Sequence, residues 1–272
     1  MGNPDGRYPT LSISILAGAA YALSIGLHEA AHAVTGLITG GAPALISSTD
    51  VRGDFSGVSD AGYAAIGASG SLVNLLITAA GYVLLQPAAR RTDGVRVFGW
   101  VLFAINGFIP FVYLVFSPLL GFGDWTSVFN RLDVPFPFRL AASGAGVLLS
   151  FVWFRLSSQT LAGMIGENAH ASRKSITQKI AVTSWLAGTA VALAAALLSP
   201  LDFAWALLIA TGSTMGTTWL LLPAADRAAS MMHIENNKPI QDAAISIPML
   251  LLSLAVIAGF IFVLGPGIQF NP

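Results

Sequence analysis

The sequence predicts an all-α polytopic membrane protein with about seven transmembrane helices, and three observations support this fold class. Of the 272 residues, 55% are hydrophobic and only 10% are charged, whereas about 25% are charged in typical soluble domains. The mean hydropathy is +0.73. The apolar residues also gather in segments of the ~20 residues that a helix needs to cross a bilayer. We therefore expect an integral, multi-pass protein of the cell membrane that contacts the lipid bilayer.

Seven segments are long and apolar enough to be spans. They cover roughly residues 11–40, 62–86, 95–118, 138–158, 179–199, 203–222 and 245–265. Glycine and proline inside them are no objection, because membrane helices tolerate both. Between the first two spans, alternation in "ALISSTDV" followed by Gly53 and Gly57 predicts a short strand or hairpin.

Composition also limits the function. The 13 basic and 13 acidic residues balance, so we expect no nucleic-acid partner. The chain has no cysteine, which excludes disulfides, thiolate metal sites and a cysteine nucleophile. No connection between spans is long enough for a soluble domain of typical size.

The first span contains "GLHEAAHAV", which places His28, Glu29 and His32 at membrane depth. Residues four apart lie on one face of a helix, so both imidazoles can reach a single ion. H-E-x-x-H is the metalloprotease pattern of two zinc ligands and a general base. The first three predicted spans carry no lysine or arginine away from their ends to pair with Glu29, which favours a metal over a buried ion pair.

A catalytic zinc site usually takes a third protein ligand and keeps a fourth position open. The candidates outside the first span are His170, His233, Glu167 and several aspartates. Both histidines lie in polar segments, where we expect solvated surface side chains. Asp124 differs, because it follows the third span in "LLGFGDWTSVF", on a glycine-rich turn that can bring the carboxylate back towards the membrane.

Three motifs together resemble the site-2 protease family of intramembrane zinc metalloproteases. They are HEAAH in the first span, "ASGSLVNLL" in the second and "GFGDW" after the third, and "INGFIP" upstream is similar to the Asn-x-x-Pro that often precedes the ligand aspartate. Two positions depart from the family pattern. Ser71 stands where the family has proline, and Trp125 stands where it usually has glycine.

The resemblance covers roughly residues 11–140 and implies a function. It implies one Zn²⁺ per chain held by His28, His32 and Asp124, with Glu29 as the base. It also implies that Asn74 contacts the substrate backbone or the developing oxyanion. The implied reaction is hydrolysis of peptide bonds in or near transmembrane segments of a membrane-protein or peptide substrate.

On this basis residues 11–158 form a metalloprotease-like membrane core, and residues 159–272 form three additional spans of unknown role. Ser47, Ser48, Thr49, Asp50 and Asp54 are candidates to line a polar route to the metal, or they form a solvated loop. Small residues at 187–199 and 210–218 permit close helix packing or a homodimer contact.

Three alternatives stay open. A different membrane zinc protease would use a downstream glutamate, Glu167 or Glu235, as the third ligand. A non-proteolytic metal-binding transporter or sensor would use the histidines to carry an ion, although transporters tend to show repeated halves. The third alternative is an inactive scaffold that binds membrane helices. The intact Glu29 disfavours this alternative.

Membrane orientation is the last expectation. Alternating sides put ten basic residues on the side of the N-terminus and three on the other, so the positive-inside rule predicts a cytoplasmic N-terminal side. The histidines lie in the half of the first span away from that side. In the family this end usually faces the cytosol, so the two indications disagree.

Overall fold

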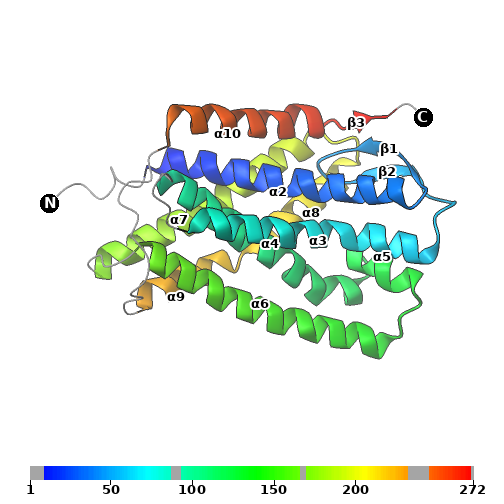
Figure 1. Cartoon of the computed structure of the whole chain (residues 1–272), viewed down its shortest axis with the longest axis horizontal. Coiled ribbons are helices and arrows are strands. Elements are labelled where there is room, and N and C mark those ends of the chain that lie inside the picture. The colour runs from blue at the N-terminus through cyan, green and yellow to red at the C-terminus, as the bar shows by residue number, and fades with distance from the viewer. Residues whose placement is uncertain (1–8, 87–92, 166–169, 232–244, 271–272) are drawn as a thin grey trace.

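A computed structural model describes residues 9–86, 93–165, 170–231 and 245–270 as a bundle of long helices with a small sheet at one end (Figure 1). Within these residues, seven helical segments are long and apolar enough to cross a membrane. The predicted all-α polytopic fold is therefore confirmed.

The spans follow the chain in order. They are α2 (Thr10–Ile38), α3 (Asp60–Leu85), α4 (Asp93–Leu120), α6 (Phe136–Ile165), α7 (His170–Ala196), a sixth span made of α8 (Phe203–Thr211), η1 (Gly212–Gly216) and α9 (Leu221–Ser230), and a seventh made of α10 (Ile247–Gly259) and η2 (Phe260–Leu264). The fourth and sixth spans continue past their predicted ends, and the fifth begins before its predicted start. Polar and charged residues continue these helices beyond the apolar stretch, so hydropathy alone makes them too short.

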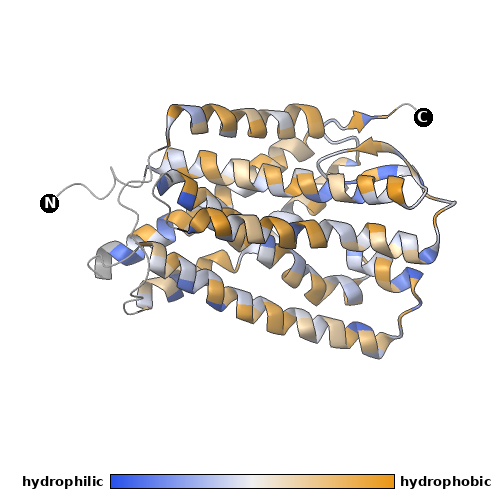
Figure 2. Cartoon of the chain, in the orientation of Figure 1, coloured by the Kyte–Doolittle hydropathy of each residue, from blue (hydrophilic) through white to orange (hydrophobic). Residues whose placement is uncertain are grey.

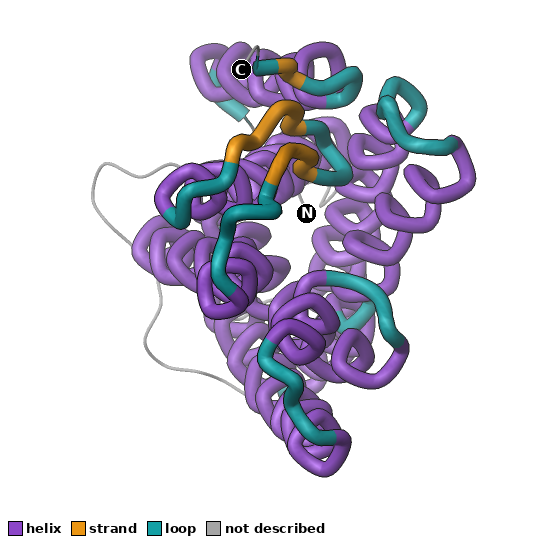
Figure 3. Tube along the Cα trace, turned by 90° about the vertical axis from the view of Figure 1, so that its right-hand side faces the viewer, coloured by secondary structure: helices purple, strands orange, loops and turns teal. Residues whose placement is uncertain are grey.

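The predicted hairpin is present between the first two spans. Strands β1 (Ala42–Ile46) and β2 (Val51–Asp54) pair antiparallel, and β3 (Ile268–Gln269) joins β1 from the C-terminal end in the order β2-β1-β3. The two-residue β3 and the short helix α5 (Asp124–Arg131) were not predicted, because both are too short for a hydropathy pattern to be detected in the sequence. Figure 3 views the bundle from the end that carries the strands.

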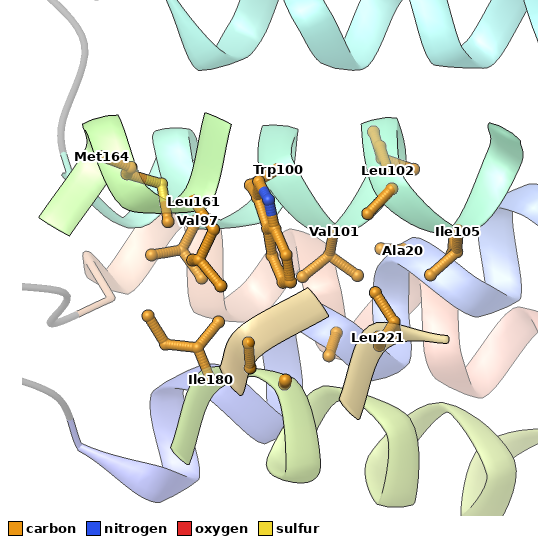
Figure 4. Packing of buried hydrophobic residues seen from close by; sticks show 14 of the residues in the cluster. Ala20, Val97, Trp100, Val101, Leu102, Ile105, Leu161, Met164, Ile180 and Leu221 are labelled. Carbon is orange, nitrogen blue, oxygen red and sulfur yellow. The ribbon is translucent and has the colours of Figure 1, made fainter. Parts of the chain in front are cut away.

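The core forms around α4, which contacts α2, α3 and α6. Trp100 is fully buried there, and its indole nitrogen donates a hydrogen bond to the Ser157 carbonyl at 3.2 Å. Figure 4 shows Trp100 among residues of several spans, including Leu161, Ile180 and Leu221. The first four spans and the last three therefore share one hydrophobic core, and their division into two functional parts stays a prediction.

The packing of α7 against α2 depends on a small residue in the predicted close-packing segment. A side chain at Gly188 would begin 2.2 Å from the ring of Tyr21. The segment therefore braces the first span, as expected from its composition. A homodimer stays a prediction.

Hydrophobic residues predominate along the length of the helices, and hydrophilic residues concentrate towards the two ends of the bundle (Figure 2). This distribution is compatible with a multi-pass membrane protein. The hairpin, α5 and the C-terminal half of α2 meet at one end, and the candidate site lies there.

Candidate metal centre

The two histidines of the motif lie one turn apart on α2 and point to the same place. Nε2 of His28 is 3.1 Å from Nε2 of His32. Their rings meet edge to face, with centroids 4.7 Å apart. The helical spacing thus brings two nitrogen ligands to one point, as the sequence predicted.

Asp124 reaches the same point from the start of α5. Its Oδ2 atom lies 3.1 Å from Nε2 of His28 and 3.5 Å from Nε2 of His32. Gly121 and Gly123 turn the chain before it with φ values of 77° and 87°, which are left-handed conformations that favour glycine. The glycine-rich turn therefore does bring this carboxylate back to the histidines.

Two glycines of α3 make room for this arrangement. A Cβ atom at Gly70 would lie 2.5 Å from the imidazole of His28, and one at Gly67 would lie 3.0 Å from the backbone oxygen of Asp124. Gly70 belongs to the motif recognised in the sequence, whereas Gly67 was missed. The three-residue spacing of the two glycines on one helix face was the available signal.

The other ring nitrogen of each histidine has a partner on α3. Nδ1 of His32 is 2.6 Å from the carbonyl oxygen of Ile66, and Nδ1 of His28 is 2.6 Å from the amide oxygen of Asn74. A carbonyl oxygen can only accept, so His32 must donate from Nδ1. Its Nε2 is then left with a lone pair facing the shared point, unless the ring is protonated.

A chain of hydrogen bonds fixes His28 in the same way. Asn106 donates from Nδ2 to the carbonyl of Leu102 at 2.9 Å and to the Ser24 hydroxyl at 2.7 Å. Its amide oxygen therefore accepts from Nδ2 of Asn74 at 2.6 Å. Because the Leu102 carbonyl can only accept, the amide of Asn106, and then that of Asn74, has one possible orientation. The amide oxygen of Asn74 therefore accepts from Nδ1 of His28.

Two imidazole lone pairs and a carboxylate oxygen consequently converge within a few ångströms of one another. Such an arrangement requires a cation between them, either a metal ion or protons on the rings. When the rings also carry a proton on Nε2, hydrogen bonds from His28 and His32 lower the pKa of the Asp124 carboxyl and outweigh burial, which would raise this pKa. Asp124 is thus ionised beside protonated rings, and a metal ion can take the place of those protons.

The donor set fits a zinc ion. The ligand atoms of His28, His32 and Asp124 all lie within 4.8 Å of one another, so this group could hold a metal. Tetrahedral zinc with bonds of about 2.0–2.1 Å keeps its ligand atoms about 3.3 Å apart, close to the 3.1–3.5 Å found here. Two imidazoles and one carboxylate are also a typical set for a catalytic site with one open position.

Glu29 lines the same cavity as the three candidate ligands, which has a volume of about 790 Å³. Its carboxylate has no hydrogen-bond partner among the residues that the structure describes. A carboxylate in such a cavity, with no fixed partner, is able to take up and release a proton.

Other predicted site residues have different outcomes. Ser48, Thr49 and Asp50 line the cavity. Asp54 instead accepts a hydrogen bond from the backbone nitrogen of Ser56 in the exposed part of the hairpin, and Ser47 bonds to Asp50 within the turn.

Some alternatives fall where the structure gives no side chains. His233, Glu167 and Glu235 lie outside the described residues, and His170 begins α7 without a described side chain. The role of Asn106 was missed, since its link to His28 depends on the packing of three helices.

Comparison of the chain with models of known protein families, with curated proteins and with solved structures found no match.

Proposed function

We propose that this chain is an intramembrane zinc metalloprotease that hydrolyses peptide bonds in or near transmembrane segments of membrane proteins. One observation carries the proposal. Two imidazole nitrogens and one ionised carboxylate converge at zinc-like spacing, and Glu29 of the same motif lines the adjoining cavity. The site-2 protease resemblance names the same residues.

Zinc, when bound, supplies Lewis-acid activation of the peptide carbonyl and of a water molecule. The chain would supply the rest. His28, His32 and Asp124 would hold the ion. Glu29 would take the proton from the attacking water and then pass it to the departing amine nitrogen, so that one carboxylate acts first as base and then as acid.

Asn74 would serve this site through His28. Its oxygen accepts from Nδ1 of His28 and one of its two N–H groups goes to Asn106, which leaves a single N–H for a substrate carbonyl. Groups that orient a ligating histidine commonly affect metal affinity by about 10–100-fold. We therefore assign Asn74 mainly a positioning role and keep substrate contact as its second.

The hairpin offers a way to hold an extended substrate. In the order β2-β1-β3, β2 is an edge strand, and Val51 at its start lines the cavity. A helical substrate must unwind to expose its carbonyls, and an unwound segment can add to a sheet edge. Membrane proteins or peptides with such segments are thus the proposed substrates, in the cell membrane.

A metal-binding transporter or sensor is the second candidate, and the site favours it less. Among the described residues, His28, His32 and Asp124 form the single cluster of three such ligands. An ion pathway would require further ligands along the bundle. Glu29, which would act as a general base in a protease, would also have no role in a carrier.

The test is cleavage of a transmembrane peptide by the purified protein in detergent. Glu29→Gln should retain zinc and lose about 10²–10⁴-fold in rate, because it removes the proton acceptor and no ligand. Asp60→Asn changes an exposed carboxylate at the start of α3 and should cleave normally. Equal cleavage by wild type and Glu29→Gln would overturn the assignment of the base.

A further inference from the structure

The cavity beside the metal centre extends to the sixth span, to which no motif assigned a role. One helix face of α8 and η1 forms its far wall, with Trp205, Leu208, Ile209, Gly212, Ser213 and Gly216. These positions recur every three or four residues, so they point in one direction. The near wall holds the candidate ligands and the turn between β1 and β2.

Two glycines leave the far wall hollow. The position of a Cβ atom at Gly212 has no described atom within 4 Å, and at Gly216 the nearest is a backbone oxygen of the same span at 3.9 Å. Glycine inside a helix costs about 0.5–1 kcal/mol relative to alanine and is usually explained by a close neighbour. Here no described part of the protein occupies that space, so the hollow is available to a ligand.

The hairpin turn beside the same cavity contains a buried hydroxyl without a hydrogen-bond partner in the part of the chain that the structure describes. Ser48 is only 6% exposed, it lines the cavity, and its Oγ has no hydrogen-bond partner among the described residues. Buried polar atoms are nearly always hydrogen-bonded. The hydroxyl therefore has unused capacity to donate and to accept a hydrogen bond at the edge of the cavity.

The turn that carries Ser48 is held in place relative to the far wall. The Ser48 backbone nitrogen donates to the carbonyl of Leu264 at 2.8 Å, and the Thr49 hydroxyl lies 2.9 Å from that of Ser199, just before the sixth span. The turn and the apolar face of α8 and η1 thus form two sides of one cavity.

We propose that this space is a substrate subsite that binds a bulky apolar side chain close to the scissile bond. The side chain would fill the hollow at Gly212 and Gly216, against Leu208 and Ile209. The Ser48 side chain would turn towards the cavity to bond to a backbone carbonyl or N–H of the same unwound segment. The proposal rests on the proposed protease function and specifies its substrates as membrane segments with a large apolar residue beside the cleavage site.

The first test fills the hollow. Gly212→Leu and Gly216→Leu are assayed on two transmembrane peptides that differ only by leucine or alanine beside the cleaved bond. The ratio of the two rates should fall at least about 10-fold, since a few methylene groups in an apolar pocket discriminate by this much. Gly144→Leu, which adds the same side chain into open space on α6, should leave the ratio unchanged. An unchanged ratio in both cavity variants would overturn the subsite.

The second test does not depend on cleavage. A photo-crosslinking amino acid replaces Ser213 in the Glu29→Gln protein, and a control replaces the exposed Leu254 of α10. The leucine peptide should crosslink at position 213 and not at 254, and Gly212→Leu should reduce the yield at least several-fold. Crosslinking at position 213 without cleavage by the wild type would contradict the protease function and support the apolar binding site. Cleavage without crosslinking at position 213 would support the protease function and contradict the subsite.

Discussion

Nδ1 of His28 lies 2.6 Å from the amide oxygen of Asn74, and this contact connects the candidate metal centre to the interior of the bundle. Asn74 and Asn106 are 1% and 0% exposed, so both amides are buried and both depend on each other for hydrogen bonds. The orientation of a ligand on the first span is thus set by α3 and α4.

Asn106→Leu should weaken zinc binding about 10–100-fold although Asn106 touches no metal, because it removes the group that orients the Asn74 amide. Competition with a zinc-chelating dye measures this affinity. Gln159→Leu makes the same kind of change at an exposed site on α6 and should have no effect. Unaltered zinc affinity in Asn106→Leu would mean that the chain of amides is only structural.

Gly70→Ala should abolish zinc binding while the protein still folds as a bundle. The added Cβ atom would lie 2.5 Å from the His28 ring, so the imidazole must move away from the other two ligands. Metal analysis and size-exclusion chromatography of the same sample separate loss of metal from loss of fold. Gly144→Ala is the matched control, since its Cβ meets open space.

The degree to which the sequence predicted this site differs between its parts. His28 and His32 follow from helical spacing and Asp124 from its glycine turn, which are local properties. The series of hydrogen bonds from Leu102 through Asn106 to His28 depends on how α2, α3 and α4 pack. No spacing of residues along the sequence indicates it. The hollow at Gly212 could not be predicted either, because small residues in a span equally indicate close packing, as they do at Gly188.

Gly123→Ala should reduce zinc binding by displacing Asp124. Its φ of 87° costs about 1 kcal/mol or more for a residue with a side chain, and the new Cβ would lie 2.3 Å from the hydroxyl of Tyr113. Zinc titration should show a weaker site, and the apparent melting temperature in detergent should fall. Gly259→Ala, in open space and without a positive φ, should change neither.

The seven described spans place the start of α2 and the end of η2 at opposite ends of the bundle (Figure 1). With seven spans, the excess of basic residues lies at the end of the bundle where α2 begins, and the positive-inside rule places that end in the cytoplasm. The metal centre, near the other end, is then predicted to lie towards the non-cytoplasmic face. The chain has no cysteine, so single cysteines can report on each side. In intact cells an impermeant maleimide should label Ser56→Cys and not Asp226→Cys, and the opposite pattern would favour the orientation usual in site-2 proteases.

The central claim is that His28, His32 and Asp124 together hold one zinc ion, and the metal content of the purified protein tests it most directly. Wild type and the control Asp60→Ala should each contain about one zinc per chain, and His28→Ala and Asp124→Ala should lose it, because each removes one of three protein ligands. Zinc retained in Asp124→Ala would show that the third ligand is a different residue. Wild-type protein that binds no zinc even after loading would contradict the metalloprotease account as a whole.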